Sequence, residues 1–305
     1  MVTARRHIRT RSSPRADELP PRIQFYFASL PPNRIVLTFT AMHLLSTLAV
    51  GLTGLLTFTS GATFSNPLKD PNGSDPHIVY DGTYYFLMTT TWTDLQITKA
   101  TTLEGLKTGE TKVVWTDDNP TRCCSMWAPE LQWMGDRWYI YYTAGEEASL
   151  DLQRPHALAG GTSPWDDFTY ASDGSMTGDQ WAIDATVLRM PDGNYFVYSC
   201  MTDVGQSLCI APMTSATTLG ASSVLSQPTE DWERVETPVQ EGAAPMYHEG
   251  NVFLTYSGSY CWTDSYQLGL LTYDGSGDPA LSSSWTKTGP VFSSANGNYG
   301  TGHNG

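Results

Sequence analysis

Charged residues are scarce in this chain, and basic residues are the scarcest. Asp, Glu, Lys and Arg make up 16% of the 305 residues, and beyond residue 62 only 10 Lys and Arg accompany 29 Asp and Glu. With a net charge of about −19, this part of the chain has no basic footprint for nucleic acid or an anionic membrane. The composition excludes nucleic-acid binding and favours a neutral partner.

Two further patterns are missing. No amphipathic helical periodicity recurs between the apolar segments, which disfavours parallel-sheet folds with crossover helices. No zinc-type Cys or Cys/His spacing and no EF-hand loop occurs. The chain instead has 27 Gly, 19 Pro and ten Trp, and every Trp lies beyond residue 90. This mixture is typical of an all-β protein with many turns and an aromatic-lined cleft.

The first 62 residues differ from the rest. Residues 1–41 hold seven Arg against one Asp and one Glu, and an apolar run of about 15 residues then ends in small residues. This pattern predicts a signal peptide over 42–62, cleaved after Ala62; the alternative is a short membrane anchor. We interpret residues 1–41 as an upstream extension, with Met42 as the true initiator. The mature domain, 63–305, is expected to be secreted, extracellular and free of the membrane.

Some of the five Cys should be paired in a secreted chain. Cys200 and Cys209 flank a predicted hairpin and could bridge it. Cys123 and Cys124 either bond to each other or have two different partners. The odd number of Cys leaves the complete pairing open.

Four segments of the chain share one design. Each has a leading carboxylate, runs through a short apolar strand, turns at Asp-Gly, Gly-Asp or Glu-Gly, and returns in a strand rich in aromatic residues, as β-hairpins do. The leading carboxylates, spaced 55, 54 and 57 residues apart, are Asp75, Glu130, Asp184 and Glu241. A unit of about 55 residues can hold four short strands, which is one propeller blade. A fifth unit begins at Thr301, so we predict a five-bladed β-propeller whose fifth blade is truncated at the C-terminus.

Propeller geometry brings the leading carboxylates together. The innermost strands start near the axis, so residues that head them converge on one end of the channel. Crowded carboxylates raise one another's pKa, an arrangement that costs stability unless chemistry uses it. The alternative is that they only cap turns, as Asp75 could in its Ser-Asp-Pro turn. Three carboxylates in one register favour an acidic pocket.

Five ordered motifs run from about residue 66 to the end of the chain: SDPHIVY, MWAPEL, AIDATVL, VQEGAAP and TGHNG. Together they resemble glycoside hydrolase family 43, and more narrowly its exo-acting α-L-arabinofuranosidases. The resemblance implies a five-bladed propeller that hydrolyses arabinan, arabinoxylan or xylan with inversion. The chain departs from the pattern at Ala185 and at Gly242, where Gly and Pro are usual, but neither departure removes a carboxylate.

The resemblance also implies roles for single residues. Asp75 would be the general base, Glu241 the general acid, and Asp184 the residue that raises the pKa of the acid and orients it. Trp127 would contact the sugar, although an indole is also an ordinary core residue. His303 matches a position near a bound cation, usually contacted through water. That cation would be a structural calcium on the axis, and the chemistry would need no cofactor.

The resemblance implies a plant cell-wall polysaccharide or oligosaccharide as substrate, and we expect a monomer. Glu130, His77, His156 and His248 are assigned structural roles. A β-xylosidase or an endo-arabinanase of the same family remains an alternative. A β-fructosidase would explain the Asp-Pro-Asn-Gly string at 70–73, but its later motifs are missing. A sugar-binding propeller without catalysis would need no carboxylate at three blade heads.

Overall fold

The computed structural model describes residues 63–304, which form four antiparallel β-sheets. The upstream extension expected over 1–41 and the signal peptide expected over 42–62 lie outside the described residues. Helices in this part of the chain are three short 3₁₀ segments, Glu104–Thr108, Asp231–Glu233 and Ser282–Ser284. None of these is long and apolar enough to cross a membrane.

Each sheet is built from strands that follow one another along the chain and pair with their neighbours. The first sheet contains β1 (His77–Tyr80), β2 (Tyr85–Met88), β3 (Leu95–Ala100) and β4 (Glu110–Trp115). The second contains β5 (Cys124–Trp133), β6 (Trp138–Glu146), β7 (Ser149–Ala159) and β8 (Thr169–Tyr170). The third contains β9 (Ala182–Met190), β10 (Gly193–Met201) and β11 (Gln206–Ser215), with β12 (Thr218–Leu219) and β13 (Ser223–Ser226) both pairing with β11. The fourth contains β14 (Gln240–His248), β15 (Asn251–Gly258), β16 (Gln267–Tyr273) and β17 (Trp285–Phe292).

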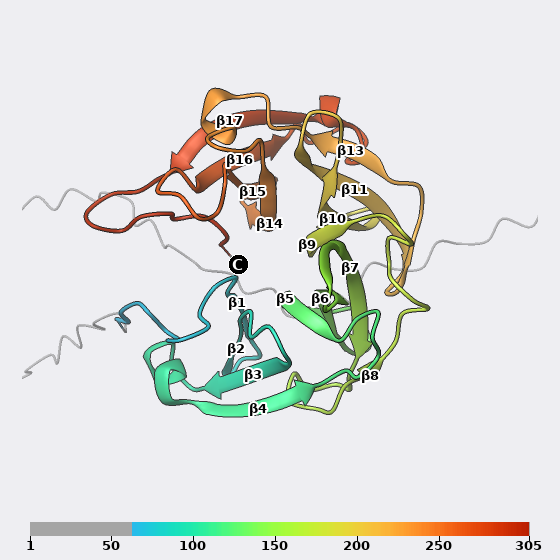
Figure 1. Cartoon of the computed structure of the whole chain (residues 1–305), viewed down its shortest axis with the longest axis vertical. Coiled ribbons are helices and arrows are strands. Elements are labelled where there is room, and N and C mark those ends of the chain that lie inside the picture. The colour runs from blue at the N-terminus through green and yellow to red at the C-terminus, as the bar shows by residue number, and fades with distance from the viewer. Residues whose placement is uncertain (1–62, 305) are drawn as a thin grey trace, which may run out of the picture. The chain divides into compact units, whose positions relative to one another are not determined.

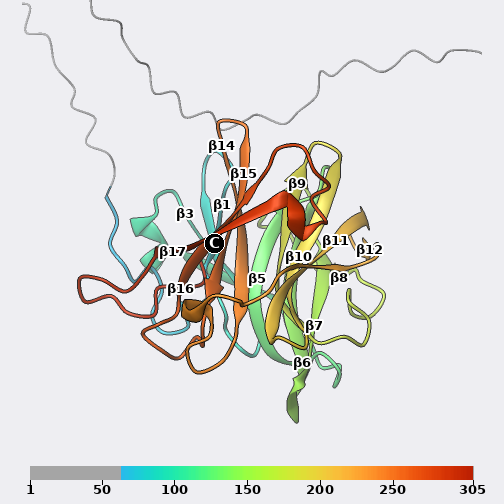
Figure 2. The same cartoon turned by 90° about the horizontal axis from the view of Figure 1, so that it is seen from above.

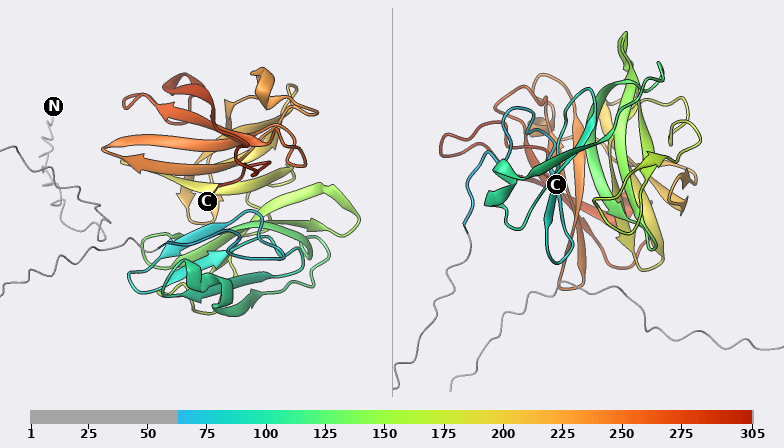
Figure 3. Two further views of the ribbon diagram at one scale, coloured as in Figure 1. Left: turned by 90° about the vertical axis from the view of Figure 1, so that its left-hand side faces the viewer. Right: turned by 90° about the horizontal axis from the view of Figure 1, so that it is seen from below.

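The four sheets surround a common centre. Figure 1 shows β1, β5, β9 and β14 innermost, and β4, β8, β13 and β17 at the periphery. Figure 2 shows the labelled inner strands β1, β5, β9 and β14 running alongside one another through the domain, and the left view of Figure 3 separates the sheets of the first half of the domain (blue to green) from those of the second half (yellow to red). This is a β-propeller with four blades in residues 63–304, so the predicted all-β propeller is confirmed. The expected fifth blade is not seen in this range, where residues 301–304 form no strand.

Three apolar clusters hold the blades together, each between two successive sheets. Successive strand residues point to opposite faces of a sheet. Ile140 therefore packs toward the first sheet, whereas Tyr141 packs toward the third. Phe196 and Val197 divide in the same way between the second and fourth sheets. Because each buried side chain of this size contributes about 1.5–3 kcal/mol, this packing fixes the blades around the centre.

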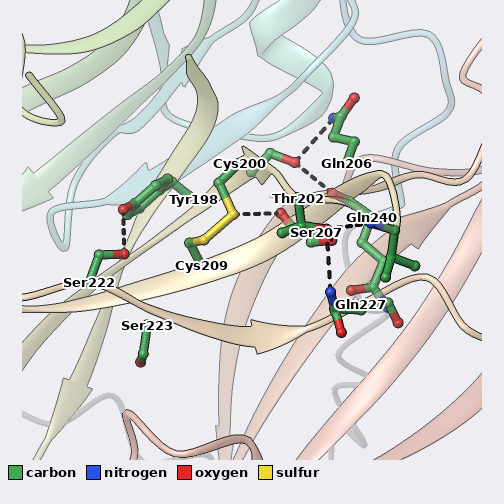
Figure 4. Close-up of a disulfide and its surroundings, with 12 residues drawn as sticks. Tyr198, Cys200, Thr202, Gln206, Ser207, Cys209, Ser222, Ser223, Gln227 and Gln240 are labelled. Atoms are coloured by element: carbon green, nitrogen blue, oxygen red, sulfur yellow. Dashed lines mark hydrogen bonds between the residues drawn. A yellow bond between two sulfur atoms is a disulfide. The ribbon is translucent and has the colours of Figure 1, made fainter. Parts of the chain in front are cut away.

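The cysteines follow the alternatives set by the sequence. Cys200 and Cys209 form a disulfide across the β10–β11 hairpin, as expected (Figure 4). Cys123 and Cys124 are bonded to each other rather than to separate partners. Cys261 is an exposed free thiol.

Candidate active site

A shared distortion of the inner strands determines which side chains reach the centre. The backbone takes a positive φ just before β1 and within β5, β9 and β14: 54° at Asp75, 42° at Ala128, 55° at Asp184 and 56° at Gly242. β5 has a second such residue, Ser125, at 50°. The ladders to the second strands shift register nearby in the second, third and fourth sheets. Such a bulge interrupts the alternation of side chains. The third blade presents two consecutive residues of its inner strand to the cavity, Ile183 and Asp184, whereas the inner strands of the second and fourth blades present one each, Trp127 and Glu241.

This pattern corrects the register expected for Glu130. Its spacing placed it in line with Asp75 and Asp184, but the second blade has Ala128 at that position. Glu130 lies two residues further along β5, where it lines a separate cavity of about 150 Å³. There its Oε1 is 3.7 Å from Nδ1 of His77. The spacing argument was wrong for this residue, which is kept apart from the other three carboxylates.

The five residues expected to form the site line one cavity of about 580 Å³: Asp75, Trp127, Asp184, Glu241 and His303. This volume lies within the range of small-molecule sites. The wall also contains three aromatic side chains that the sequence reasoning did not identify, Trp92, Trp262 and Tyr266. The cavity is thus acidic at its carboxylate cluster and aromatic elsewhere on its wall.

Asp75 is held as a carboxylate. His303 Nδ1 lies 3.0 Å from its Oδ1, and the Thr90 hydroxyl donates a hydrogen bond to its Oδ2. The Thr90 oxygen in turn accepts a hydrogen bond of 2.8 Å from the backbone N–H of Ala128. Burial raises the pKa of Asp75, but the charge of His303 and hydrogen bonds from His303, Thr90 and Ser74 outweigh it and lower the pKa to about 2. Asp75 is therefore ionised at neutral pH.

Asp184 and Glu241 behave in the opposite way. Both are buried, each with 8% of its surface exposed. Burial raises the pKa of Asp184; the charge of His303 opposes this, and the charges of Glu241 and Asp75 add to it. Burial likewise raises the pKa of Glu241, against the charge of His303 and a hydrogen bond from Gln206. Neighbouring buried carboxyl groups do not readily ionise together, so this pair retains a proton near neutrality.

His303 supplies the positive charge of the cluster. Its backbone N–H donates to Ser257 Oγ at 2.6 Å, and its Nδ1 lies 3.8 Å from Asp184 Oδ2. Burial lowers the pKa of His303, but the charges of Asp75 and Asp184 raise it to about 10. Gly242 leaves room for the ring, because a Cβ at this position would lie 2.9 Å from His303 Cγ.

The described residues fit a protonated cluster better than a metal centre built from side chains. Within residues 63–304, no three His, Cys, Asp or Glu side chains are arranged to hold a metal ion. Nδ1 of His303 is directed at Asp75 instead. Calcium takes six to eight oxygen ligands, so a calcium ion here would depend on water and backbone oxygens.

Trp127 lines the cavity and has an indole N–H that is not used within residues 63–304. Its Nε1 is buried without a hydrogen-bond partner among the described residues. Its ring meets Trp92 edge-on, with centroids 5.7 Å apart. Trp92 has a φ of 74°, held by backbone hydrogen bonds in both directions with Met126. An oxygen of a bound ligand that reached Nε1 of Trp127 could accept a hydrogen bond from it.

Known proteins resemble this chain over most of its length. The model of "Glycosyl hydrolases family 43" matches residues 64–305. An "Extracellular exo-alpha-(1->5)-L-arabinofuranosidase" of Streptomyces avermitilis is 36% identical over 256 residues, covering 79% of this chain and 53% of the relative. An "Alpha-L-arabinofuranosidase B" of Pyricularia oryzae is 35% identical over 249 residues, covering 75% and 50%. The chain thus spans about half the length of these two relatives.

A solved structure agrees with these matches. The crystal structure of an alpha-L-arabinofuranosidase from Lactobacillus brevis aligns with a TM-score of 0.68 and 27% identity, covering 74% of each chain. Family and fold therefore point the same way, and the match includes the whole cavity described above. The chain belongs to glycosyl hydrolases family 43.

Proposed function

We propose that this protein is an inverting, exo-acting glycoside hydrolase that releases L-arabinofuranose from arabinan or arabinoxylan. Asp75 acts as the general base, Glu241 as the general acid, and Asp184 keeps the acid protonated. The observation that carries the proposal is that one cavity holds an ionised carboxylate and a pair of carboxyl groups that retains a proton. Inverting glycosidases need both forms.

The roles follow from the chemistry of inversion. Asp75 removes a proton from a water molecule whose oxygen attacks the anomeric carbon. Glu241 gives its proton to the leaving oxygen on the opposite face of the sugar. Room for the water requires a separation of about 6.5–9.5 Å between the two carboxyl groups. Their placement on different blades, before β1 and on β14, supports such a separation.

The substrate and setting rest on similarity. The two curated relatives are named for arabinofuranosidase activity, and the name of one includes "extracellular". Because of this word we extend the proposal to secretion. We also extend it to a propeller of five blades, because His303, with a φ of 49°, continues the pattern of positive φ set by Asp75, Asp184 and Gly242. The proposed chemistry uses no cofactor; a calcium on the axis would be structural and held near His303 through water.

Replacing Glu241 with Gln tests the proposal. We expect Glu241→Gln to lower the rate on debranched arabinan about 10²- to 10⁴-fold, the usual contribution of a general acid. Glu130→Gln is the matched control, since Glu130 lies on an inner strand but lines the other cavity, and its rate should stay within about threefold. Undiminished hydrolysis by Glu241→Gln would overturn the assignment. Arabinose as the first product from debranched arabinan indicates exo action, whereas oligosaccharides would indicate an endo-arabinanase. Release of xylose from xylobiose, assayed separately, would indicate a β-xylosidase.

A further inference from the structure

Gln206 contacts the proposed acid from outside the cavity. Its Nε2 lies 2.6 Å from Oε2 of Glu241, across 35 residues of sequence, and 3.1 Å from Oγ of Ser199. Gln206 is not part of the cavity wall. Its amide therefore acts on Glu241 and not on a bound sugar.

The hydrogen bonds around Ser199 fix the orientation of this amide. The Ser199 hydroxyl donates its single hydrogen to the carbonyl oxygen of Gln240 at 2.5 Å. It can therefore only accept from Gln206, so the NH₂ group and not the amide oxygen must face it. Figure 4 shows Gln206 and Gln240 at the two ends of this chain of bonds.

The same argument locates the proton of Glu241. The NH₂ group of Gln206 has two hydrogens, one directed to Ser199 and the other to Oε2 of Glu241. Both oxygens of a carboxylate can accept such a bond, but in a neutral carboxyl group the oxygen that accepts it is the one without the proton. When Glu241 is protonated, as the proposed function requires, its proton is therefore on Oε1.

Gln206 sits on a stiff support. It is the first residue of β11, directly after the turn of the hairpin that the Cys200–Cys209 disulfide crosses (Figure 4). Within the turn, the Thr202 hydroxyl lies 3.0 Å from both Gly205 O and Ser207 Oγ. A donor held in this way loses little entropy when it is used.

The peptide before Glu241 is fixed from the other side. Gln240, which is fully buried, donates from Nε2 to Oε1 of Glu233 at 2.7 Å. Glu233 is also fully buried and pairs with Lys287 at 2.8 Å. Glu241 is therefore held through its carboxyl group by Gln206 and through its backbone by Gln240.

We propose that Gln206 is the positioning residue of the general acid, pinning Oε2 of Glu241 so that Oε1 delivers the proton. The proposal rests on the function proposed above. In the reaction, the O–H bond at Oε1 breaks and the proton goes to the leaving glycosidic oxygen. The water gives its hydroxyl to the anomeric carbon and its proton to Asp75. Glu241 ends as a carboxylate, to which the Gln206 N–H donates a stronger, charge-assisted bond.

The Gln206→Met variant, which removes the donor at nearly constant length, tests this step in the full chain. With (1→5)-α-L-arabinobiose, whose leaving group needs the proton, kcat should fall about 10- to 100-fold while KM stays within about threefold. With 2,4-dinitrophenyl α-L-arabinofuranoside, whose leaving group departs unprotonated, kcat should fall less than about threefold. The hydroxyl of Tyr266, the other hydrogen-bond partner of this carboxyl group, is unchanged in the variant.

Gln227→Met is the matched control, because the amide of Gln227 bonds Thr202 in the same turn without touching Glu241. Both substrates should be turned over by it at nearly the rate of the parent chain. Equal losses on the two substrates in Gln206→Met, or no loss on either, would overturn the proposal. If Gln206→Met does not fold, Ser199→Ala removes the hydroxyl that orients the amide. We then expect kcat to fall more on arabinobiose than on the dinitrophenyl substrate, by a smaller factor than in Gln206→Met, and the absence of this split between the two substrates counts against the proposal.

The Glu241→Gln variant separates this inference from the proposed function. A split between the two substrates in Glu241→Gln, without one in Gln206→Met, refutes only the role of Gln206. If Glu241→Gln shows no split, the acid itself is misassigned and the proposed function fails with it.

Discussion

Lys287 carries the charge that balances the buried carboxylate of Glu233, next to the strand that bears Glu241. Its Nζ lies 2.8 Å from one carboxylate oxygen and 3.1 Å from the other, and Glu233 is fully buried. Lys287→Met leaves this carboxylate uncompensated, a change that costs about 3–5 kcal/mol. In domains of about 150–250 residues, 1 kcal/mol shifts Tm by about 2–4 °C, so we expect Tm to fall by about 6–20 °C.

Thermal unfolding followed by circular dichroism measures this change. The control is Lys107→Met, which removes a pair with Glu104 that is open to solvent on both sides. Such pairs contribute at most about 1 kcal/mol, so its Tm should stay within about 4 °C of the parent value. A Lys287→Met variant as stable as this control would refute the reasoning. The double variant Lys287→Met/Glu233→Gln removes both charges. Its loss of stability should be smaller than the sum of the losses in the two single variants, because no unpaired carboxylate is then left buried.

Three further outcomes follow from the structure. Burial and the charge of Arg122 lower the pKa of His156 to about 4, so between pH 6.5 and 4 this side chain binds a proton only in the unfolded chain. The free energy of unfolding should therefore drop by up to about 3 kcal/mol as the pH falls through this window, and guanidinium unfolding of His156→Gln should show a shallower drop. Gly242→Ala places a Cβ against His303 at a φ of 56°; we expect about 1–2 kcal/mol lower stability and at least a tenfold loss of kcat on arabinobiose, and an unchanged kcat would count against the cluster described here. Trp127→Phe removes the unused N–H and should raise KM for arabinobiose about 3- to 10-fold, as the loss of one hydrogen bond would; an unaltered KM would show that the sugar does not use it.

The blade repeat could be predicted because every unit carries the same local chemistry. Each has a hairpin with a turn that needs positive φ, and aromatic strands that pack against the next sheet. The four sheets and the Cys200–Cys209 bridge follow directly from these patterns. The sequence also brought Asp75, Asp184 and Glu241 to one cavity, because each lies at or near the start of an inner strand.

The register within a blade could not be predicted in the same way. It depends on residues of positive φ in or just before the inner strands. Nothing in the residue type indicates this conformation at Ala128, and at Asp75 and Asp184 the preference of Asp for it is too weak to fix a register. Counting from carboxylate to carboxylate therefore placed Glu130 two residues out of line. At Gly242 the residue type does permit this backbone conformation without strain.

The contact between Gln206 and Glu241 could not be predicted from the sequence either. A Gln beside a hairpin turn has no pattern that singles it out, and the contact joins two different blades. Such contacts depend on how the sheets pack around the centre, and the periodicity of one segment does not specify that packing. Positioning groups of this kind are found only once the strands are placed in space.

The stereochemistry of hydrolysis tests the central claim most directly. Hydrolysis of p-nitrophenyl α-L-arabinofuranoside by the full chain can be followed by proton NMR in D₂O, early enough to precede mutarotation. If Asp75 activates a water and Glu241 protonates the leaving oxygen, the first arabinose to appear is the β-anomer. Initial appearance of the α-anomer would require a covalent intermediate and would contradict these roles.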